Sequence, residues 1–136
     1  MEFNYTIEGG NFSGAGVASS NVKKILKQLN VDNTLIKRVV IALYEAEVNV
    51  VAHAWEGRIE VRINPHSIEM VITDKGPGIP DIEQAMQEGY STASPEVRAM
   101  GFGAGMGLPN IRKNCDDLNI VSKTNVGTTV TMIIYL

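Results

Sequence analysis

The stretch that decides the fold is Asp74-Lys75-Gly76-Pro77-Gly78-Ile79-Pro80-Asp81. It follows an apolar run, 68–72, that is typical of a strand. Two glycines and two prolines then force the backbone into an irregular loop, because glycine allows positive φ and proline fixes φ. Asp74 falls where the strand ends, a position from which a carboxylate can line a cleft without entering the core.

Two other segments complete the pattern. Upstream, Glu45 and Asn49 are four residues apart in a strongly helical segment, so they project from one helix face. Downstream, the chain has glycine at every second position, which predicts a loop with almost no side-chain bulk: Gly101, Gly103, Gly105 and Gly107. Together the three segments are typical of a nucleotide site.

Composition limits the classes of function. The 136 residues suffice for one compact domain, which we expect to span 1–136. The net charge of −3 and the pI near 5.3 argue against sequence-independent binding to nucleic acid or to an anionic membrane. A single cysteine, Cys115, excludes an internal disulfide and a multi-cysteine metal site. The chain shows neither a membrane-length apolar run nor a signal-peptide pattern, so we expect a cytoplasmic protein.

Hydrophobic periodicity predicts the elements. Strands are expected at 3–7, 58–64, 67–73, 119–123 and 128–135, and helices at 11–30, 33–55, 81–88 and 108–118, with a long mobile loop at 89–107. This order implies an α+β two-layer sandwich, in which helices cover one face of a mixed, mostly antiparallel sheet. Val22, Ile25 and Leu29 fit either the core or an interface, and we favour the core. Cys115 is expected to be a small buried apolar residue.

The helical pair has a plain and a chemical interpretation. A lone helical glutamate such as Glu45 most often makes a salt bridge or faces solvent. Beside Asn49, however, it offers the oxygen ligands that Mg²⁺ prefers when it bridges to phosphates. His53 extends the same face, and we assign it a structural hydrogen-bonding role. Glu47 is expected to point elsewhere on the helix, into solvent.

The two loops also have two interpretations each. Asp74 alone could simply form a turn, but a carboxylate there can also accept a hydrogen bond from the exocyclic amine of adenine, where guanine presents a carbonyl. The glycine run could be merely flexible. Gly107, however, leads into a helix whose free N–H groups suit phosphate oxygens. The run is neither a P-loop nor a dinucleotide fingerprint, since it lacks the Gly-Lys-Ser/Thr sequence and a preceding strand.

These residues resemble the sequence boxes of a known superfamily. The segments 45–49, 74–78, 103–108 and 127–128 are similar, in order, to the N, G1, G2 and final Gly-Thr boxes of the GHKL ATPases, which share the Bergerat ATP-binding fold. Within that superfamily the chain resembles the bacterial anti-sigma-factor serine kinases of the RsbW, SpoIIAB and RsbT group. Segments 79–82 and 88–92 are most similar to the RsbT-like branch.

The resemblance implies a role for each matching position. Glu45 corresponds to the general base and Asn49 to the Mg²⁺ ligand. Asp74 corresponds to the adenine-reading carboxylate. The remaining nucleotide-binding positions are those that approach the base or wrap the phosphates: Gly76, Gly78, Gly103, Gly105, Gly107, Leu108 and Thr128. Arg98 falls in the lid, where it either contacts the γ-phosphate or is solvated.

The implied activity is phosphoryl transfer from ATP, with Mg²⁺, to a serine or threonine of a STAS-domain anti-sigma antagonist protein. The alternative is an ATP-gated partner-switching module that sequesters a sigma factor or activates a phosphatase without catalysis. A detached histidine-kinase domain is disfavoured, because no helical hairpin with a phospho-acceptor histidine is present. The sigma-binding relatives imply that a homodimer is possible.

Overall fold

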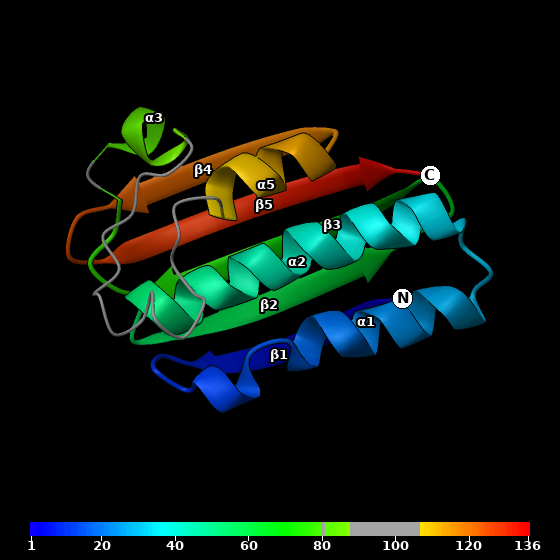
Figure 1. The fold of residues 1–136 in the computed structure, drawn as a ribbon, viewed down its shortest axis with the longest axis horizontal. Helices are drawn as coiled ribbons and strands as arrows, with labels where there is room; N and C mark the ends of the chain where they lie inside the picture. The colour runs from blue at the N-terminus through cyan, green and yellow to red at the C-terminus, as the bar shows by residue number, and fades with distance from the viewer. Residues whose placement is uncertain (80, 88–106) are drawn as a thin grey trace.

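The computed structural model describes residues 1–79, 81–87 and 107–136 (Figure 1). The strands are β1 (Glu2–Glu8), β2 (Glu56–Ile63), β3 (Ser67–Lys75), β4 (Asp117–Lys123) and β5 (Gly127–Tyr135). The helices are η1 (Phe12–Gly14, a 3₁₀ turn), α1 (Val17–Gln28), α2 (Asn33–His53), α3 (Ile82–Ala85) and α5 (Gly107–Asn114).

The described strands form one sheet in the order β1-β2-β3-β5-β4. Every neighbouring pair is antiparallel, so the sheet is antiparallel across the described strands and not mixed. The pairing of β3 with β5, from Ser67↔Tyr135 to Thr73↔Thr129, places β5 inside the sheet, between the central strand β3 and the edge strand β4. The loop that follows β3 therefore lies beside the start of β5.

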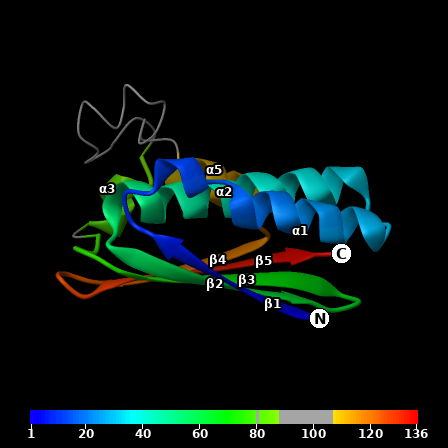
Figure 2. The ribbon, with the colours of Figure 1, turned by 90° about the horizontal axis from the view of Figure 1, so that it is seen from below.

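The helices lie on one face of this sheet, as Figure 2 shows. Alternate residues of β2, β3 and β5 point toward the helices and are buried, which is the period expected for a sheet with one covered face. The predicted two-layer α+β sandwich is confirmed. The fully buried side chains come from both layers and include Val22, Leu26, Val39, Leu43, Ile59, Ile68, Met70, Ile111, Met132 and Ile134. Of the three α1 positions assigned to the core, Val22 is buried, Ile25 is half-buried, and Leu29 is 39% exposed.

Several predicted helix boundaries are wrong. The helix expected at 81–88 ends at Ala85, and the one expected at 33–55 ends at His53. The helix expected at 11–30 begins only at Val17, because Gly16 has φ of +94° and interrupts the helical backbone after the 3₁₀ turn. The helix expected at 108–118 ends at Asn114. Strand pairing takes over there, since Asp117 and Leu118 are already in register with Ile133 and Met132 of β5.

Cys115 lies between α5 and β4 and is half-buried. Burial raises the pKa of its thiol to about 11, and Arg38 nearby lowers it only in part. A thiol in this state is a poor nucleophile at neutral pH, in agreement with the predicted structural role.

Over the described ranges, no helix is both long enough and sufficiently apolar to cross a lipid bilayer.

Candidate nucleotide site

The helical pair Glu45 and Asn49 lies where α2 packs against the start of α5. Both side chains are half-buried, as expected for residues at the border of the buried stripe of α2. Asn110 Nδ2, from the first turn of α5, donates a hydrogen bond of 3.3 Å to Glu45 Oε1. This contact orients the carboxylate toward the N-terminal end of α5, and only one of its two oxygens takes part.

Gly107 brings the beginning of α5 against Asn49. A Cβ added at Gly107 would lie 3.0 Å from Asn49 Oδ1 and 3.2 Å from Nδ2, closer than ordinary van der Waals contact. The missing side chain thus allows the helix end to approach the amide. Leu108, the next residue, is 7% exposed and anchors α5 in the core. The structure therefore brings Glu45, Asn49 and Gly107 together, as the sequence predicted.

The second group of site residues lies at the end of β3. Asp74 is half-buried, and its Oδ1 accepts a hydrogen bond of 3.1 Å from the Thr128 backbone N–H. Burial raises the pKa of Asp74 above its ordinary value, while the bond from Thr128 opposes that shift. Gly127, just before Thr128, has no room for a side chain, since an added Cβ would overlap the carbonyl oxygen of Asp74.

The loop after Asp74 is fixed by contacts to β4 and α2. Gly78 has φ of +78°, and an added Cβ would lie 2.6 Å from the Lys123 carbonyl oxygen. At Gly76 it would lie 3.0 Å from Cα of Ala54, the residue that caps the C-terminal end of α2. Both glycines thus let the loop pack closely against β4 and the C-terminal end of α2. This packing keeps Asp74 beside α2, the helix that carries Glu45 and Asn49.

Sequence reasoning missed Ser122 of β4. Its Oγ accepts a hydrogen bond of 2.7 Å from the Ile79 N–H and lies 2.8 Å from Thr128 Oγ1. Ser122 therefore holds the loop and the threonine in one network. Its position directly opposite Thr128 in the β4–β5 hairpin was the available signal, since facing hydroxyl residues pair across strands.

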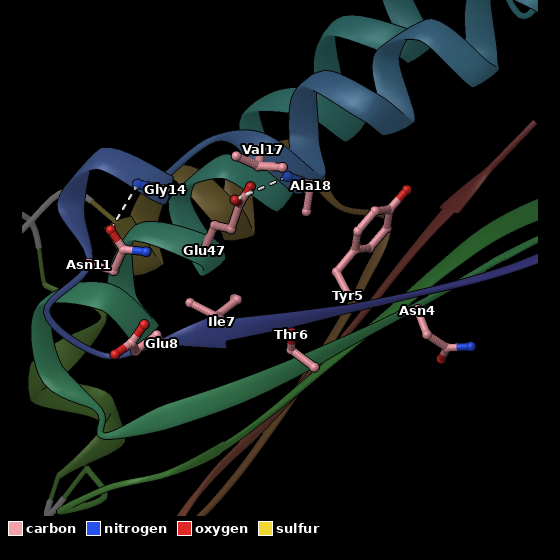
Figure 3. A pocket seen from close by; sticks show the side chains of 10 residues that line it. All are labelled: Asn4, Tyr5, Thr6, Ile7, Glu8, Asn11, Gly14, Val17, Ala18 and Glu47. Carbon is pink, nitrogen blue, oxygen red and sulfur yellow. Dashed lines mark hydrogen bonds between the residues drawn. The ribbon is translucent and has the colours of Figure 1, made fainter.

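The prediction that Glu47 faces solvent is wrong. Its side chain is 2% exposed and accepts three hydrogen bonds from the backbone at the start of α1: Gly16 N–H at 2.9 Å, Ala18 N–H at 3.2 Å and Ser19 N–H at 3.0 Å. Figure 3 shows the bond from Ala18. Helix α1 begins after Gly16, which has no side chain to cap it, so a carboxylate from α2 takes that role. The signals were the missing cap residue and the placement of Glu47 three residues before Val50 and four after Leu43, on the apolar stripe.

His53 ends α2, and burial lowers its pKa below the ordinary value, which favours the neutral imidazole. This agrees with a structural role. Three further predicted positions, Gly103, Gly105 and Arg98, lie outside the described residues, as does most of the predicted 89–107 loop.

A family model described as "Histidine kinase-like ATPase domain" matches residues 15–134. The chain belongs to this family. The match contains both groups of site residues described above, and the resemblance to the GHKL superfamily is confirmed. The antiparallel sheet with helices on one face is accordingly the ATP-binding fold of that family.

Relatives within the family narrow the group. The chain is 37% identical to an anti-sigma F factor of Anoxybacillus flavithermus, over 76% of this chain and 69% of the relative. It is 27% identical to the serine/threonine-protein kinase RsbT of Bacillus subtilis, over 84% of this chain and 83% of the relative. The predicted enzyme class is thus confirmed at the level of the family, which includes a serine/threonine protein kinase.

A solved structure supports the fold alone. The RsbU and RsbW domains of a Mycobacterium tuberculosis protein superpose with a TM-score of 0.66 at 15% identity, over 98% of this chain and 32% of that longer chain.

Proposed function

We propose that this histidine kinase-like ATPase domain is an ATP-dependent serine/threonine protein kinase, which phosphorylates a STAS-domain anti-sigma antagonist protein. Residues 1–136 would act as one such domain in the cytoplasm. The observation that carries the proposal is the convergence of Glu45 and Asn49 of α2 on the start of α5, at Gly107 and Asn110. A carboxylate, an amide and a helix N-terminus at one point suit a hydroxyl nucleophile attacking a phosphate.

Glu45 is the proposed general base. Its Oε1 accepts the bond from Asn110, and no hydrogen bond within the described ranges engages Oε2, the oxygen proposed to take the proton of the attacking hydroxyl. General-base assistance of this kind contributes typically about 10²–10⁴-fold to a rate. Positioning and charge neutralisation at the phosphates would supply most of the rest.

Asn49 is the proposed protein ligand of Mg²⁺. Among the described residues, no three His, Cys, Asp or Glu side chains gather in a way that could hold a metal ion. A hard cation beside Asn49 would then complete its oxygen shell with phosphate oxygens and water, as Mg²⁺ in nucleotide sites commonly does. When bound, the ion would neutralise phosphate charge.

Asp74 is the proposed reader of adenine. One carboxylate oxygen accepts the bond from Thr128, and the other, which has no hydrogen bond to any described residue, would accept from the exocyclic amine of the base. Gly76 and Gly78 are the proposed positions where the backbone approaches the base, and Thr128 is the proposed second contact to it. Gly107 and Leu108 would adjoin the phosphates, with Gly103 and Gly105 as the proposed lid.

The proposed partner follows from the relatives, among which are anti-sigma F factors and a serine/threonine-protein kinase. A STAS-domain antagonist is the proposed substrate, and a sigma factor or a phosphatase is the proposed second partner. The anti-sigma relatives also favour a second candidate function, in which ATP gates partner binding without phosphorylation. A homodimer is compatible with either.

The test is phosphotransfer read by intact mass. The protein is incubated with Mg-ATP and a purified STAS-domain protein encoded near it, in parallel with Glu45→Ala and with the control Glu69→Gln, which alters a carboxylate on the uncovered face of the sheet. We expect a gain of one phosphate with the wild type and with Glu69→Gln, and none with Glu45→Ala, which should still bind ATP. Complex formation without phosphate would favour the gated binding module. A fully active Glu45→Ala protein would contradict the assigned base.

A further inference from the structure

Strand β1 forms one edge of the sheet, and its open side borders a pocket. The strand pairs only with β2 in the described sheet. Ile63 N–H bonds to the Met1 carbonyl and Gly9 N–H bonds to the Trp55 carbonyl, so the odd-numbered residues of β1 direct their backbone groups toward β2. Antiparallel strands alternate, which leaves the even-numbered residues pointing to the open side.

The open side therefore presents a row of backbone donors and acceptors. Glu2, Asn4, Thr6 and Glu8 belong to this row, and the Glu8 carbonyl already accepts from Asn11 N–H. For Asn4 and Thr6, the described residues provide no partner on this side. An edge of this kind is a template for pairing with another strand.

The pocket continues from this edge to the underside of α1 (Figure 3). It measures about 420 Å³ and is lined by the β1 residues Asn4 to Glu8, by Val17 and Ala18 at the start of α1, and by Asn11, Gly14 and Glu47. Tyr5 and Ile7 point toward the helices, while Val17 is 64% exposed at the rim. Side chains of a strand added to β1 alternate in the same way, so every second one would enter this pocket, where Ile7, Val17 and Ala18 offer apolar contact beside polar lining residues.

The charges along the open edge of β1 indicate which kind of added strand would fit there. Two carboxylates, Glu8 and Glu47, line the pocket, and no lining residue is basic. Glu56 lies opposite Glu8 in β2, which adds a second carboxylate at that end, although it pairs with Lys75 at 3.2 Å. At the other end, Glu2 is 3.8 Å from Arg62. The acidic end is thus the one that contains Glu8.

These charges disfavour a second copy of this chain. If two β1 strands paired antiparallel through all four outward residues, Glu2 of each would face Glu8 of the other. Like charges directly opposite one another destabilise strand pairing. A partner strand with lysine or arginine facing Glu8 meets no such penalty.

We propose that the open edge of β1 is a docking site for an extended segment of another protein, which adds antiparallel or parallel to β1, places apolar side chains in the pocket below α1 and carries a basic residue facing Glu8. Backbone bonds to Asn4 and Thr6 hold the segment, and the pocket selects its side chains. This surface is separate from the residues of the proposed nucleotide site, so its occupation requires neither ATP nor Glu45.

The test uses two synthetic peptides as long as β1, 7 residues, one alternating valine with lysine and the other alternating valine with glutamate. Binding is followed by backbone amide shifts in two-dimensional NMR without nucleotide. We expect the lysine peptide to bind and to shift the amides of Asn4, Thr6 and Glu8, and the glutamate peptide to bind at least about tenfold more weakly, since one unfavourable charge contact is of this order.

Two variants of one residue separate edge pairing from other modes of binding. Thr6→Pro removes an outward N–H while leaving the β2 ladder intact, because proline is tolerated on the open side of an edge strand. Thr6→Val keeps that N–H. We expect Thr6→Pro to abolish peptide binding, Thr6→Val to retain it, and both to bind ATP as the wild type does.

Charge reversal gives a test that leaves the backbone unchanged. Glu8→Lys should shift the preference toward the glutamate peptide. The proposal is wrong if neither peptide binds, if Thr6→Pro or Glu8→Lys leaves binding unchanged, or if the wild type proves to be a dimer that Thr6→Pro dissociates, which would assign this edge to a second copy.

Discussion

The Thr128 N–H donates a 3.1 Å hydrogen bond to Asp74 Oδ1 and so joins the start of β5 to the end of β3. The two residues are 54 positions apart in the chain. Gly127 makes the contact possible, because any side chain there would collide with the Asp74 carbonyl. Within the part of the chain that the structure describes, only Oδ1 takes part in a hydrogen bond, and Oδ2 is the oxygen proposed to read adenine.

Replacing Asp74 with alanine should weaken ATP binding by about 10- to 100-fold, the cost of leaving a buried polar group of the base unpaired. The preference for ATP over GTP should fall as well. Titration calorimetry with both nucleotides measures each effect. Asp81→Ala is the matched control, since Asp81 lies in the same loop but caps α3 through Gln84 N–H at 3.0 Å. Unchanged ATP affinity in Asp74→Ala would remove the adenine contact from the proposal.

Replacing Asp74 with asparagine should change how stability depends on pH. Because burial raises the pKa of Asp74 in the folded protein, the folded state binds this proton more tightly than the unfolded chain does. The stability that this contributes is fully present below the pKa of the unfolded chain, about 3.9, and is lost as pH rises through the folded pKa. Wild-type stability should therefore fall relative to Asp74→Asn across that interval and then run parallel to it. Urea unfolding of both proteins from acid to neutral pH measures the difference, and a constant difference would contradict the shifted pKa.

Gly78 and Gly10 form a matched pair for the role of close packing. Their φ angles are +78° and +79°, but an added Cβ meets the Lys123 carbonyl oxygen at 2.6 Å in the first case and nothing within 4 Å in the second. Gly10→Ala should cost roughly 1–2 kcal/mol of stability, from the left-handed backbone alone. Gly78→Ala should cost more, and should also weaken ATP binding because the loop after Asp74 must shift. Denaturant unfolding measures the loss of stability in each variant, and nucleotide titration measures the loss of ATP affinity. Equal losses of stability in the two variants would argue against the packing role of Gly78.

Removing the Glu47 carboxylate should destabilise the fold strongly. Glu47→Ala leaves three backbone N–H groups at the start of α1 without an acceptor, and we expect a loss of about 3 kcal/mol or more. Glu47→Gln should lose less, because one oxygen remains to accept. Glu69→Gln, on the uncovered face of the sheet, should stay within about 0.5 kcal/mol of the wild type. Chemical denaturation of the three variants gives the order, and a Glu47→Ala protein of wild-type stability would show that water satisfies those groups.

The sequence predicted the sheet well, because its signals are local. The alternation around Ile7, Ile59 and Ile72 locates three strands to within two residues of their observed ends. Helical spacing also predicted that Glu45 and Asn49 share one face of α2, and the structure places both at the start of α5. Their assignment to a nucleotide site stays a prediction.

The errors arise where a partner distant in sequence decides the outcome. Glu47 was assigned to solvent because a charged residue usually is, and only the uncapped start of α1, 28 or more residues away, explains its burial. Ser122 was missed in part for the same reason, because its bond from Ile79 N–H joins residues 43 positions apart, although its pairing with Thr128 is local. Leu118 was given to a helix although β5 recruits it into a strand.

The bonds from Glu47 to the start of α1 also bear on how the molecule opens. Exposing this buried carboxylate would break its hydrogen bonds to the start of α1 and would also disturb the packing of α2, which carries it. Local fraying of α1 from its N-terminal end is therefore suppressed, and the slowest hydrogen exchange in this helix should include Ala18 and Ser19 in its first turn, where helices ordinarily exchange fastest. The two helices should consequently separate from each other only when the whole domain unfolds.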